Sequence, residues 1–576
     1  MIVNEKEASF PLSNQKIWSV KILDPITKEA YSVDIDEAGN IADIKAVEAL
    51  EVVKYKEKYG KKEIALYEKL QKVNPDDTVE VGIWLTPMAD TTKPEGEISE
   101  KEYNATLDVK RKAYAQKEKP TLDMLKAKNI NVKYASQYAP LVYAEVPVKL
   151  MADIENLTDV DGIYLAREFK PMLNMVVSTE RVQPVWSAGI TGSGIKVAIV
   201  EQGRYTTLNP YLTVGSYYNP NGVISSHTTE VAGIVASTHS TYKGISYGVP
   251  GLLSANAGSW QEADIIAASE WAITNGANIL SNSWGNDTSL VMGGMDRYFD
   301  HVVWSNYKTV TAVAGNEGLT TGNVVSPGLA YNVITAGGFD DKDTSAWSDD
   351  TMWAGSSYKD PISPHGDRIK PEVVAVATHG SRYITSTYIA DPWVHAVVGA
   401  GTIYAAPAVA AEAALLMQAR SWLTSWPETV KAVIMASADH NIEGSSRLSD
   451  KDGAGGIDIS NAYNIALNQR MLGNVLSASS FPRDYPFTAG QKVRVVITWD
   501  SHPDNNHPPT SDPLQSDLDL YVYDPSGNLV TASTSFDNNY EIVEFTAPAT
   551  GNYKARATAS RFDGTNEYVG FAYTYV

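Results

Sequence analysis

The sequence contains no cysteine, which excludes disulfide bonds and metal sites built from thiolates. It also lacks a run of about 18 consecutive apolar residues, so we expect no segment to span a membrane. Basic residues are in the minority, because 47 Lys plus Arg stand against 68 Asp plus Glu and give a net charge of −21. This balance disfavours nucleic acid and anionic lipid as partners.

What is present indicates a globular chain of several domains. Its 576 residues are 43% hydrophobic and 20% charged, which is enough apolar material for several cores. Tyrosine is abundant (32 residues), as is typical of secreted and surface proteins. Residues 1–5 show neither the basic start nor the apolar core of a signal peptide. We therefore expect an extracellular or cell-surface protein whose signal has been trimmed, rather than an intracellular one.

Five motifs follow one another between residues 189 and 438. An apolar run at 196–200 is suited to a buried parallel strand and ends in Glu201. His227 begins the segment HTTEVAGIVA, a helix with many small residues. The three later segments read ILSNSWG at 279–285, TAVAGNEG at 311–318 and GTIYAAP at 401–407.

In residues and in order, these motifs resemble the subtilisin-like serine proteases (subtilases). The resemblance implies an α/β fold with a doubly wound parallel sheet. It places Glu201 as the triad acid, His227 as the triad base, Asn316 as the oxyanion amide and Ile403 at the nucleophile position. The strand that pairs with the substrate backbone would comprise Ser281, Asn282, Ser283, Trp284 and Gly285.

The chain departs from the family pattern at three of these positions. Ile403 replaces the serine, and its side chain has neither a lone pair to attack a carbonyl nor a proton for a base to remove. Glu201 is one methylene longer than aspartate, so we expect it to hold His227 poorly and a serine at 403 alone to restore little. Glu230 replaces a second histidine one turn from His227 and is a candidate ion-pair partner for it. Three departures together indicate loss of catalysis, although an engineered change at 403 is an open alternative.

Two regions are expected before this domain. Residues 1–77 predict a small α+β module, with a hairpin at 17–23 and 31–35 and a helix or helical pair at 44–73 that breaks at 59–60. Residues 78–175 predict the order βαββαβ, with a long helix at 99–128 that Pro120 interrupts or kinks. This order resembles the ferredoxin-like propeptide of the family. The resemblance implies that residues 173–184 lie across the cleft and, without a nucleophile, remain uncut.

The last two regions are expected at 176–475 and 476–576. The first alternates strands (196–200, 279–283, 309–314, 332–337) with helices (229–236, 263–275, 404–420, 427–438), as a doubly wound sheet requires. The second alternates as short strands and resembles the jelly-roll sandwich of some secreted subtilases. Its Asp500, Asp504, Asp517 and Asp519 are either calcium ligands or turn residues of an acidic protein.

Three functions are compatible with this sequence. The first is a catalytically dead protease relative with a structural or peptide-binding role and a retained propeptide. The second is a secreted serine endopeptidase whose nucleophile is substituted in this chain. The third is a subunit of an extracellular assembly, in which the propeptide-like region and the sandwich are the bonding surfaces.

Overall fold

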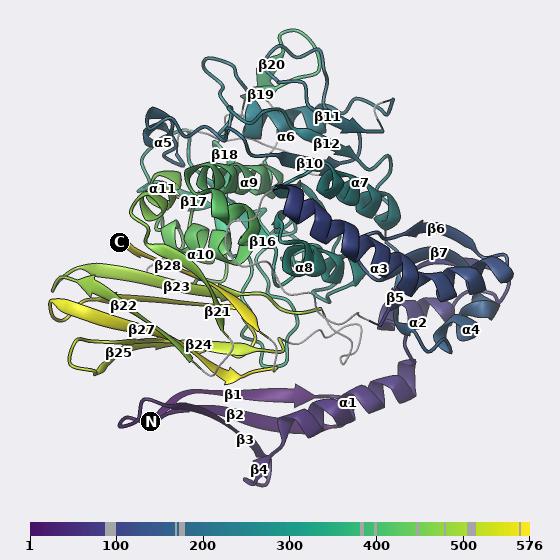
Figure 1. Ribbon diagram of the computed structural model, residues 1–576, viewed down its shortest axis with the longest axis horizontal. Helices are drawn as coiled ribbons and strands as arrows, with labels where there is room; N and C mark the ends of the chain where they lie inside the picture. The colour runs from purple at the N-terminus through teal and green to yellow at the C-terminus, as the bar shows by residue number, and fades with distance from the viewer. Residues whose placement is uncertain are drawn as a thin grey trace.

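The computed structural model arranges the chain in the four sequence regions coloured from purple to yellow in Figure 1. It describes all residues except 87–99, 168–169, 172–178, 220, 381–384, 397–399, 445–447, 477–479, 504–513 and 564–565. Predictions that fall on these segments, including the first half of the predicted cleft segment 173–184 and the calcium candidate Asp504, lie outside the described residues.

The N-terminal region is an antiparallel sheet followed by two helices. The sheet contains β1 (Ile2–Phe10), β2 (Gln15–Leu23), β3 (Ala30–Asp36) and β4 (Ile41–Ala42), in that order. The helices α1 (Ile44–Tyr59) and α2 (Ile64–Leu70) meet at Gly60, whose φ is 68°. This left-handed φ favours glycine at the helix end, and a Cβ there would displace the end of the Glu155 side chain, whose Oε1 lies 1.6 Å away. The predicted hairpin and helix break are both present, whereas β1 was not predicted.

The second region contains one four-stranded sheet and two covering helices. Its elements are β5 (Thr78–Leu85), α3 (Glu100–Ala127), β6 (Asn131–Ala135), β7 (Leu141–Pro147), a short turn η1 (Val148–Leu150), α4 (Met151–Glu155) and β8 (Val160–Leu165). The strands are antiparallel in the order β6-β7-β5-β8. The helix α3 continues through Pro120 as one element, so it is not interrupted there, and a kink at Pro120 stays a prediction.

The third region is built on an eight-stranded sheet in the order β11-β12-β10-β13-β15-β16-β17, with β18 also pairing with β16. Its strands are β10 (Val197–Glu201), β11 (Ser216–Tyr218), β12 (Leu253–Asn256), β13 (Ile279–Asn282), β15 (Thr309–Val313), β16 (Ile334–Asp340), β17 (Thr351–Met352) and β18 (Val373–Thr378). All pairs except β16–β17 are parallel. Side chains of β10 alternate between two hydrophobic cores, one on each face, which explains its continuous apolar run.

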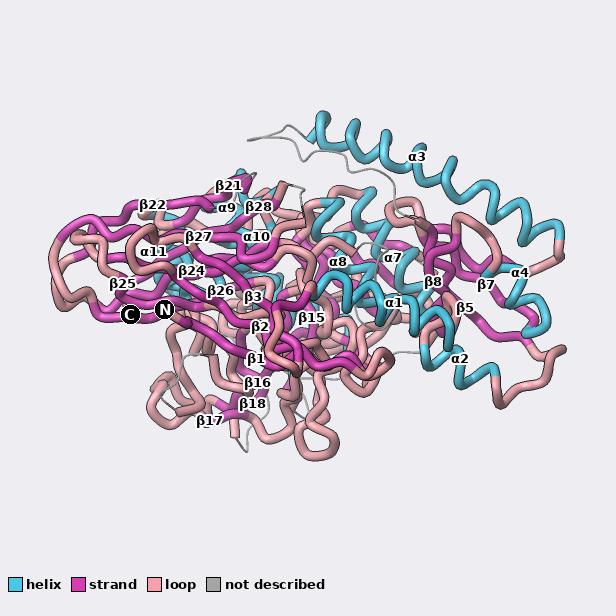
Figure 2. Tube along the Cα trace, turned by 90° about the horizontal axis from the view of Figure 1, so that it is seen from below, coloured by secondary structure: helices cyan, strands magenta, loops and turns pink. Residues whose placement is uncertain are grey.

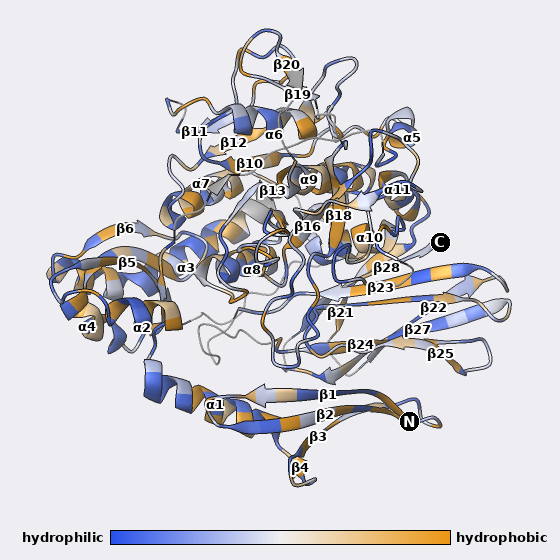
Figure 3. Ribbon diagram, turned by 180° about the vertical axis from the view of Figure 1, so that it is seen from behind, coloured by the Kyte–Doolittle hydropathy of each residue, from blue (hydrophilic) through white to orange (hydrophobic). Residues whose placement is uncertain are grey.

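Helices cover both faces of this sheet. They are α5 (Gln183–Ser187), α6 (Ser226–Ala236), α7 (Glu262–Thr274), α8 (Gly294–Asn306), α9 (Thr402–Ala419), α10 (Pro427–Ser437) and α11 (Ile459–Leu467), with a 3-10 turn η2 (Ser421–Ser425) after α9. By length and composition α9 alone among the described helices could cross a membrane, but 89% of it is buried inside the protein. Figure 3 shows the hydrophobic β18 in the same core. The helix is therefore a core element.

The fourth region is a sandwich of two four-stranded antiparallel sheets, ordered β21-β28-β23-β26 and β22-β27-β24-β25. The strands are β21 (Met471–Leu476), β22 (Ser480–Phe487), β23 (Lys492–Trp499), β24 (Asp517–Tyr523), β25 (Leu529–Ser533), β26 (Tyr540–Thr546), β27 (Gly551–Arg561) and β28 (Glu567–Tyr575). The short alternating segments at 493–498, 518–523, 542–545 and 553–557 predict β23, β24, β26 and β27, and the other four strands were not predicted.

A buried lysine joins the first region to the last. Lys21 on β2 is fully buried, and its Nζ lies 2.6 Å from Asp519 Oδ1 and 2.8 Å from Asp517 Oδ2. It also donates to the carbonyl of Ser535 at 2.6 Å and lies 4.6 Å from the centre of the Phe536 ring. Burial opposes its charge, but the two carboxylates outweigh burial and raise the pKa of Lys21.

Candidate functional site

The site lies where the chain reverses its direction across the parallel sheet. After β10 the chain forms β11 and β12 on one side of it, and then crosses to β13, β15 and β16 on the other. Loops that follow strands on either side of such a point separate and leave a crevice at the carboxyl ends. Glu201 is the last residue of β10, and so its side chain reaches this crevice.

Glu201 lies beside His227, as a triad acid does. Its Oε2 lies 3.1 Å from His227 Nδ1, and its Oε1 accepts the N–H of Ser283 at 3.2 Å. Both side chains are buried. The extra methylene therefore leaves Glu201 at ion-pair distance from His227, but these two atoms do not meet the geometry of a hydrogen bond, so how well Glu201 holds the imidazole stays a prediction. The backbone of Ser283 fixes the second carboxylate oxygen.

Ile403 occupies the second position of α9, at its N-terminal end. Its side chain is fully buried and belongs to the hydrophobic core that also contains Val231, Val313 and Val376. A side chain in this environment cannot be a nucleophile, because it has no polar atom. The position is therefore filled by packing rather than left open.

Asn316 is held in place through its amide oxygen. Its Oδ1 accepts hydrogen bonds from the Thr402 N–H (3.1 Å) and from Thr402 Oγ1 (3.0 Å). These bonds fix the amide plane, and no described residue accepts from its Nδ2. Thr402 Oγ1 in turn accepts the N–H of Gly315 at 3.2 Å, so this hydroxyl is engaged in structure.

Two further polar side chains are buried near the nucleophile position. Tyr404 is fully buried, and no described residue makes a hydrogen bond to its hydroxyl. Burial and the nearby carboxylate of Glu230 raise its pKa well above the usual value. Glu230 is itself buried on α6. Of the two carboxylates considered for His227, the one found at ion-pair distance is that of Glu201.

The predicted substrate strand is only partly correct. Ser281 and Asn282 belong to β13 and pair with β10 and β15 inside the sheet, so their backbones cannot bind a substrate. The next strand, β14 (Trp284–Gly285), has a different partner: it pairs antiparallel with β9 (Lys170–Pro171) from the second region. The chain's own backbone thus occupies the edge where a peptide would add. No local signal at residues 170–171 predicts this pairing.

Two of the carboxylates proposed for calcium have another partner. Asp517 and Asp519 surround the Lys21 ammonium, which already supplies a positive charge between them. Asp500 is buried on the loop after β23. A different group, His502 with Asp563 and Glu567, brings its ligand atoms within 4.8 Å of one another. However, its two carboxylates face opposite ring nitrogens, at 3.1 and 3.4 Å, which is the arrangement of an ion pair.

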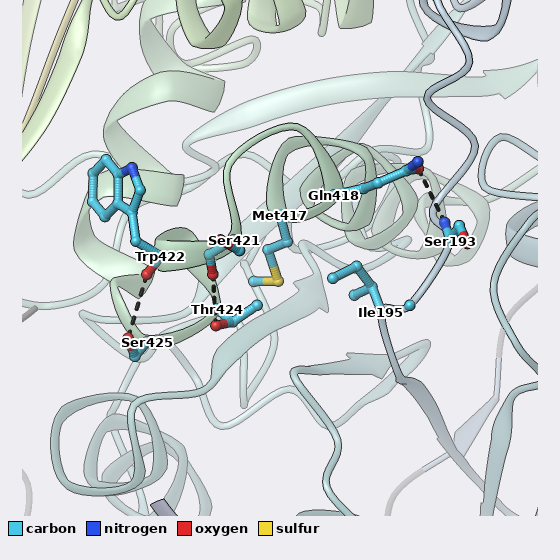
Figure 4. A pocket seen from close by; sticks show the side chains of 9 residues that line it. Ser193, Ile195, Met417, Gln418, Ser421, Trp422, Thr424 and Ser425 are labelled. Atoms are coloured by element: carbon cyan, nitrogen blue, oxygen red, sulfur yellow. Dashed lines mark hydrogen bonds between the residues drawn. The ribbon is translucent and has the colours of Figure 1, made fainter. Parts of the chain in front are cut away.

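A hollow of about 370 Å³ lies at the other end of α9, far along the helix from Ile403. Figure 4 shows Met417 and Ile195 lining it, with Gln418 reaching Ser193. The Gln418 Oε1 accepts three backbone N–H groups, from Thr191, Gly192 and Ser193. The amide oxygen of Gln418 thus holds the loop at 191–193 in place, and the hollow is not part of the site.

Glu412, further along α9 than Ile403, makes stability depend on pH. It is fully buried and neither carboxyl oxygen has a hydrogen-bond partner among the described residues. Burial and the neighbouring Glu180 raise its pKa well above the usual value, and burial raises the pKa of Glu180 to about 8. The folded state therefore holds protons that the unfolded state releases above pH ~4.5.

We accordingly expect the unfolding free energy to fall as pH rises above ~4.5, by about 1.4 kcal/mol per unit for each such group. For Glu180 the fall should end near pH 8. Glu412→Gln should flatten the fall, and the exposed Glu57→Gln should leave it unchanged. Denaturant unfolding between pH 5 and 8 measures this. Parallel profiles for wild type and Glu412→Gln would contradict the prediction.

Comparison with known proteins identifies the class. Residues 184–455 match the family model described as "Subtilase family", and residues 483–559 match "Bacterial pre-peptidase C-terminal domain". The chain thus carries a subtilase-family domain, homologous to the subtilisins, followed by a pre-peptidase C-terminal domain.

Individual relatives are distant in sequence. Serine protease AprX of Bacillus subtilis (strain 168) is 28% identical over 361 residues, which are 55% of this chain and 78% of AprX. Minor extracellular protease Epr of the same organism is 28% identical over 255 residues, 41% of this chain and 34% of Epr. Subtilisin E, also of this organism, is 27% identical over 232 residues, 37% of this chain and 60% of subtilisin E. The chain thus spans well under two thirds of Epr and somewhat less than two thirds of subtilisin E.

Proposed function

We propose that this protein is a catalytically silent subtilase-fold protein whose cleft binds extended polypeptide backbone. The observation that carries the proposal is the full burial of Ile403 at the nucleophile position, beside an assembled Glu201–His227 pair. The pair can accept a proton, but Ile403 has none to give. The site can still bind the backbone of an extended polypeptide at β14, and the side-chain amide of Asn316 is still held in place.

We further propose that residues 78–175 are a retained, ferredoxin-like propeptide domain and that residues 476–576 form a jelly roll. Support for retention comes from buried polar contacts between the second and third regions. Tyr143 donates to Glu262 at 2.7 Å and Tyr134 donates to Glu270 at 2.6 Å. The pairing of β9 with β14 continues this contact into the cleft. Relatives named as extracellular proteases support an extracellular location.

The other candidate is a serine endopeptidase seen with its nucleophile substituted. The observation that favours it is the assembled pair itself, because Glu201 and His227 lie within ion-pair distance, an arrangement that a protein without catalysis has no need to keep. The two candidates differ in the gene-encoded residue at 403, which is isoleucine in the first and serine in the second.

Peptide binding tests the proposed function. A fluorescent peptide with the sequence of residues 165–178 should bind the purified protein by replacing β9, and a scrambled peptide should not. Gly285→Ala should weaken binding, because a Cβ there would lie 2.2 Å from Val325 Cγ2 and displace β14. Ile403→Ala is the matched control and should bind like wild type. No binding by either peptide in anisotropy titrations would remove the binding role.

The retained region also predicts how the chain behaves on storage. Without a nucleophile the segment near residues 170–186 cannot be cut in cis, so the purified protein should remain one chain of 62.6 kDa. Mass spectrometry after prolonged incubation measures this. Spontaneous cleavage near 170–186 in pure material would show that the site is active.

A further inference from the structure

The outer face of the N-terminal sheet is apolar and uncovered. We define this face by the side chains of Ile2, Trp18, Val20, Ile22, Val33 and Ile35, which line a hollow of about 510 Å³. The strand register places them together, because Trp18 is opposite Ile35, Val20 opposite Val33 and Ile2 opposite Ile22. Figure 2 looks onto this sheet from below, with β1, β2 and β3 in front of the sandwich.

The opposite, inner face of β2 is already in use. Leu23 packs with Tyr521 and Tyr523 of the sandwich, and Lys21 is held by Asp517 and Asp519. An antiparallel sheet with one face on a core normally presents polar residues on its other face. In β2 both faces carry large apolar side chains, so the sequence is suited to a sheet that is covered on both sides.

This face is most exposed at its edges, whereas Val20 nearer its centre is 7% exposed and Ile22, Val33 and Ile35 are half-buried. Ile2 is 60% exposed, and Ile41, which pairs with Ile35 from the adjacent strand β4, is 84% exposed. Trp18 is half-buried at the centre of the face. A contiguous exposed patch of this kind marks an interaction site, and an aromatic side chain at its centre is typical of the residues that contribute most to binding.

Charges at the rim indicate what kind of partner fits. Glu5, Asp36 and Glu37 line the same hollow, and the basic residue of this face, Lys16, is bound to Glu7 at 2.8 Å. An acidic rim repels anionic lipid. It also opposes a second copy of a chain whose net charge is −21. The rim is complementary to a partner with basic residues beside its apolar ones.

We propose that the outer face of the N-terminal sheet binds a segment of another protein in which large apolar side chains alternate with lysine or arginine. The apolar side chains would fill the hollow around Trp18, and the basic ones would meet Glu5 and Glu37. This binding is independent of the cleft, because the face lies on a different region of the chain.

Three synthetic peptides of twelve residues test the proposal on the full-length protein. In the first, leucine alternates with lysine, in the second with glutamate, and in the third with serine. Only the lysine peptide should bind. Trp18→Thr with Ile35→Thr should weaken its binding about tenfold or more, because threonine keeps the strand but removes the apolar contact. Glu5→Gln with Glu37→Gln should weaken it several-fold and reduce its dependence on salt.

A matched control removes exposed apolar side chains elsewhere. Leu319→Thr with Ile362→Thr changes residues that are 80% and 64% exposed and lie outside the face, so binding should equal that of wild type. Thermal unfolding of each variant confirms that the sheet is intact. The proposal is overturned by equal binding of all three peptides or by equal loss in the control. It is also overturned if the wild-type protein is a dimer and, of these variants, only Trp18→Thr with Ile35→Thr is a monomer. Binding of the wild-type protein to phosphatidylcholine vesicles that this variant loses would overturn it as well.

Discussion

Incubated with a fluorophosphonate probe or an unfolded protein substrate, the wild-type protein is expected to show neither labelling nor peptidase activity. In serine hydrolases the nucleophile and histidine act as a unit, and without them only ~10³–10⁴-fold acceleration over water remains from binding and the oxyanion hole. Ile403 removes the nucleophile while Asn316 and His227 stay in place. Covalent labelling of any residue between 401 and 407 would overturn this result.

Restoring the serine should change the outcome. Since Glu201 Oε2 lies 3.1 Å from His227 Nδ1, Ile403→Ser is expected to gain probe labelling by about 100-fold or more over wild type. Ile403→Ala, which makes a similar cavity, should gain nothing. Adding His227→Ala to Ile403→Ser should abolish the gain. If Ile403→Ser labels no faster than Ile403→Ala, the pair does not act as an acid and base.

The second large effect concerns the buried lysine. Lys21→Met should destabilise the docking of the N-terminal sheet on the sandwich by ~3–5 kcal/mol, because Asp517 and Asp519 would remain buried without their counter-charge. Replacing these two aspartates with asparagine and leucine in the Lys21→Met background should recover most of the loss. Calorimetric unfolding and hydrogen exchange of β2 measure both changes.

Lys16→Met is the matched control for this prediction. Lys16 lies on the same strand, and it also forms an ion pair, with Glu7 at 2.8 Å. Both partners are exposed, so water screens the pair and its removal should change stability little. A loss in Lys21→Met no larger than that in Lys16→Met would show that the buried ion pair does not hold the two regions together.

The central fold was predictable from sequence because its signals are local. The apolar run of β10, the small residues of α9 and Pro427 at the start of α10 each specify their own element. The site residues at the ends of β10, α6 and α9 followed from motifs placed on those elements. The boundary of the substrate strand did not follow, because the chain leaves the sheet after Asn282 and no residue there marks the change.

Contacts between distant segments were not predictable in the same way. The aspartates at 517 and 519 have the composition of a cation site, and only the fold shows that the cation is the ammonium of Lys21. Likewise, the length of Glu201 suggested a poor fit to His227. Its second oxygen is fixed by a backbone N–H that the sequence does not place there.

The bond between Lys21 and Asp519 joins residues 498 positions apart. Such a contact closes a loop of nearly the whole chain. Contacts between residues so far apart in sequence form late in folding, because closing the loop costs chain entropy before the contact stabilises the fold. During synthesis the N-terminal sheet emerges long before β24, so Lys21 leaves the ribosome without its aspartates. The inner face of the sheet is therefore exposed until the sandwich has been made, and a truncated chain would leave it exposed permanently.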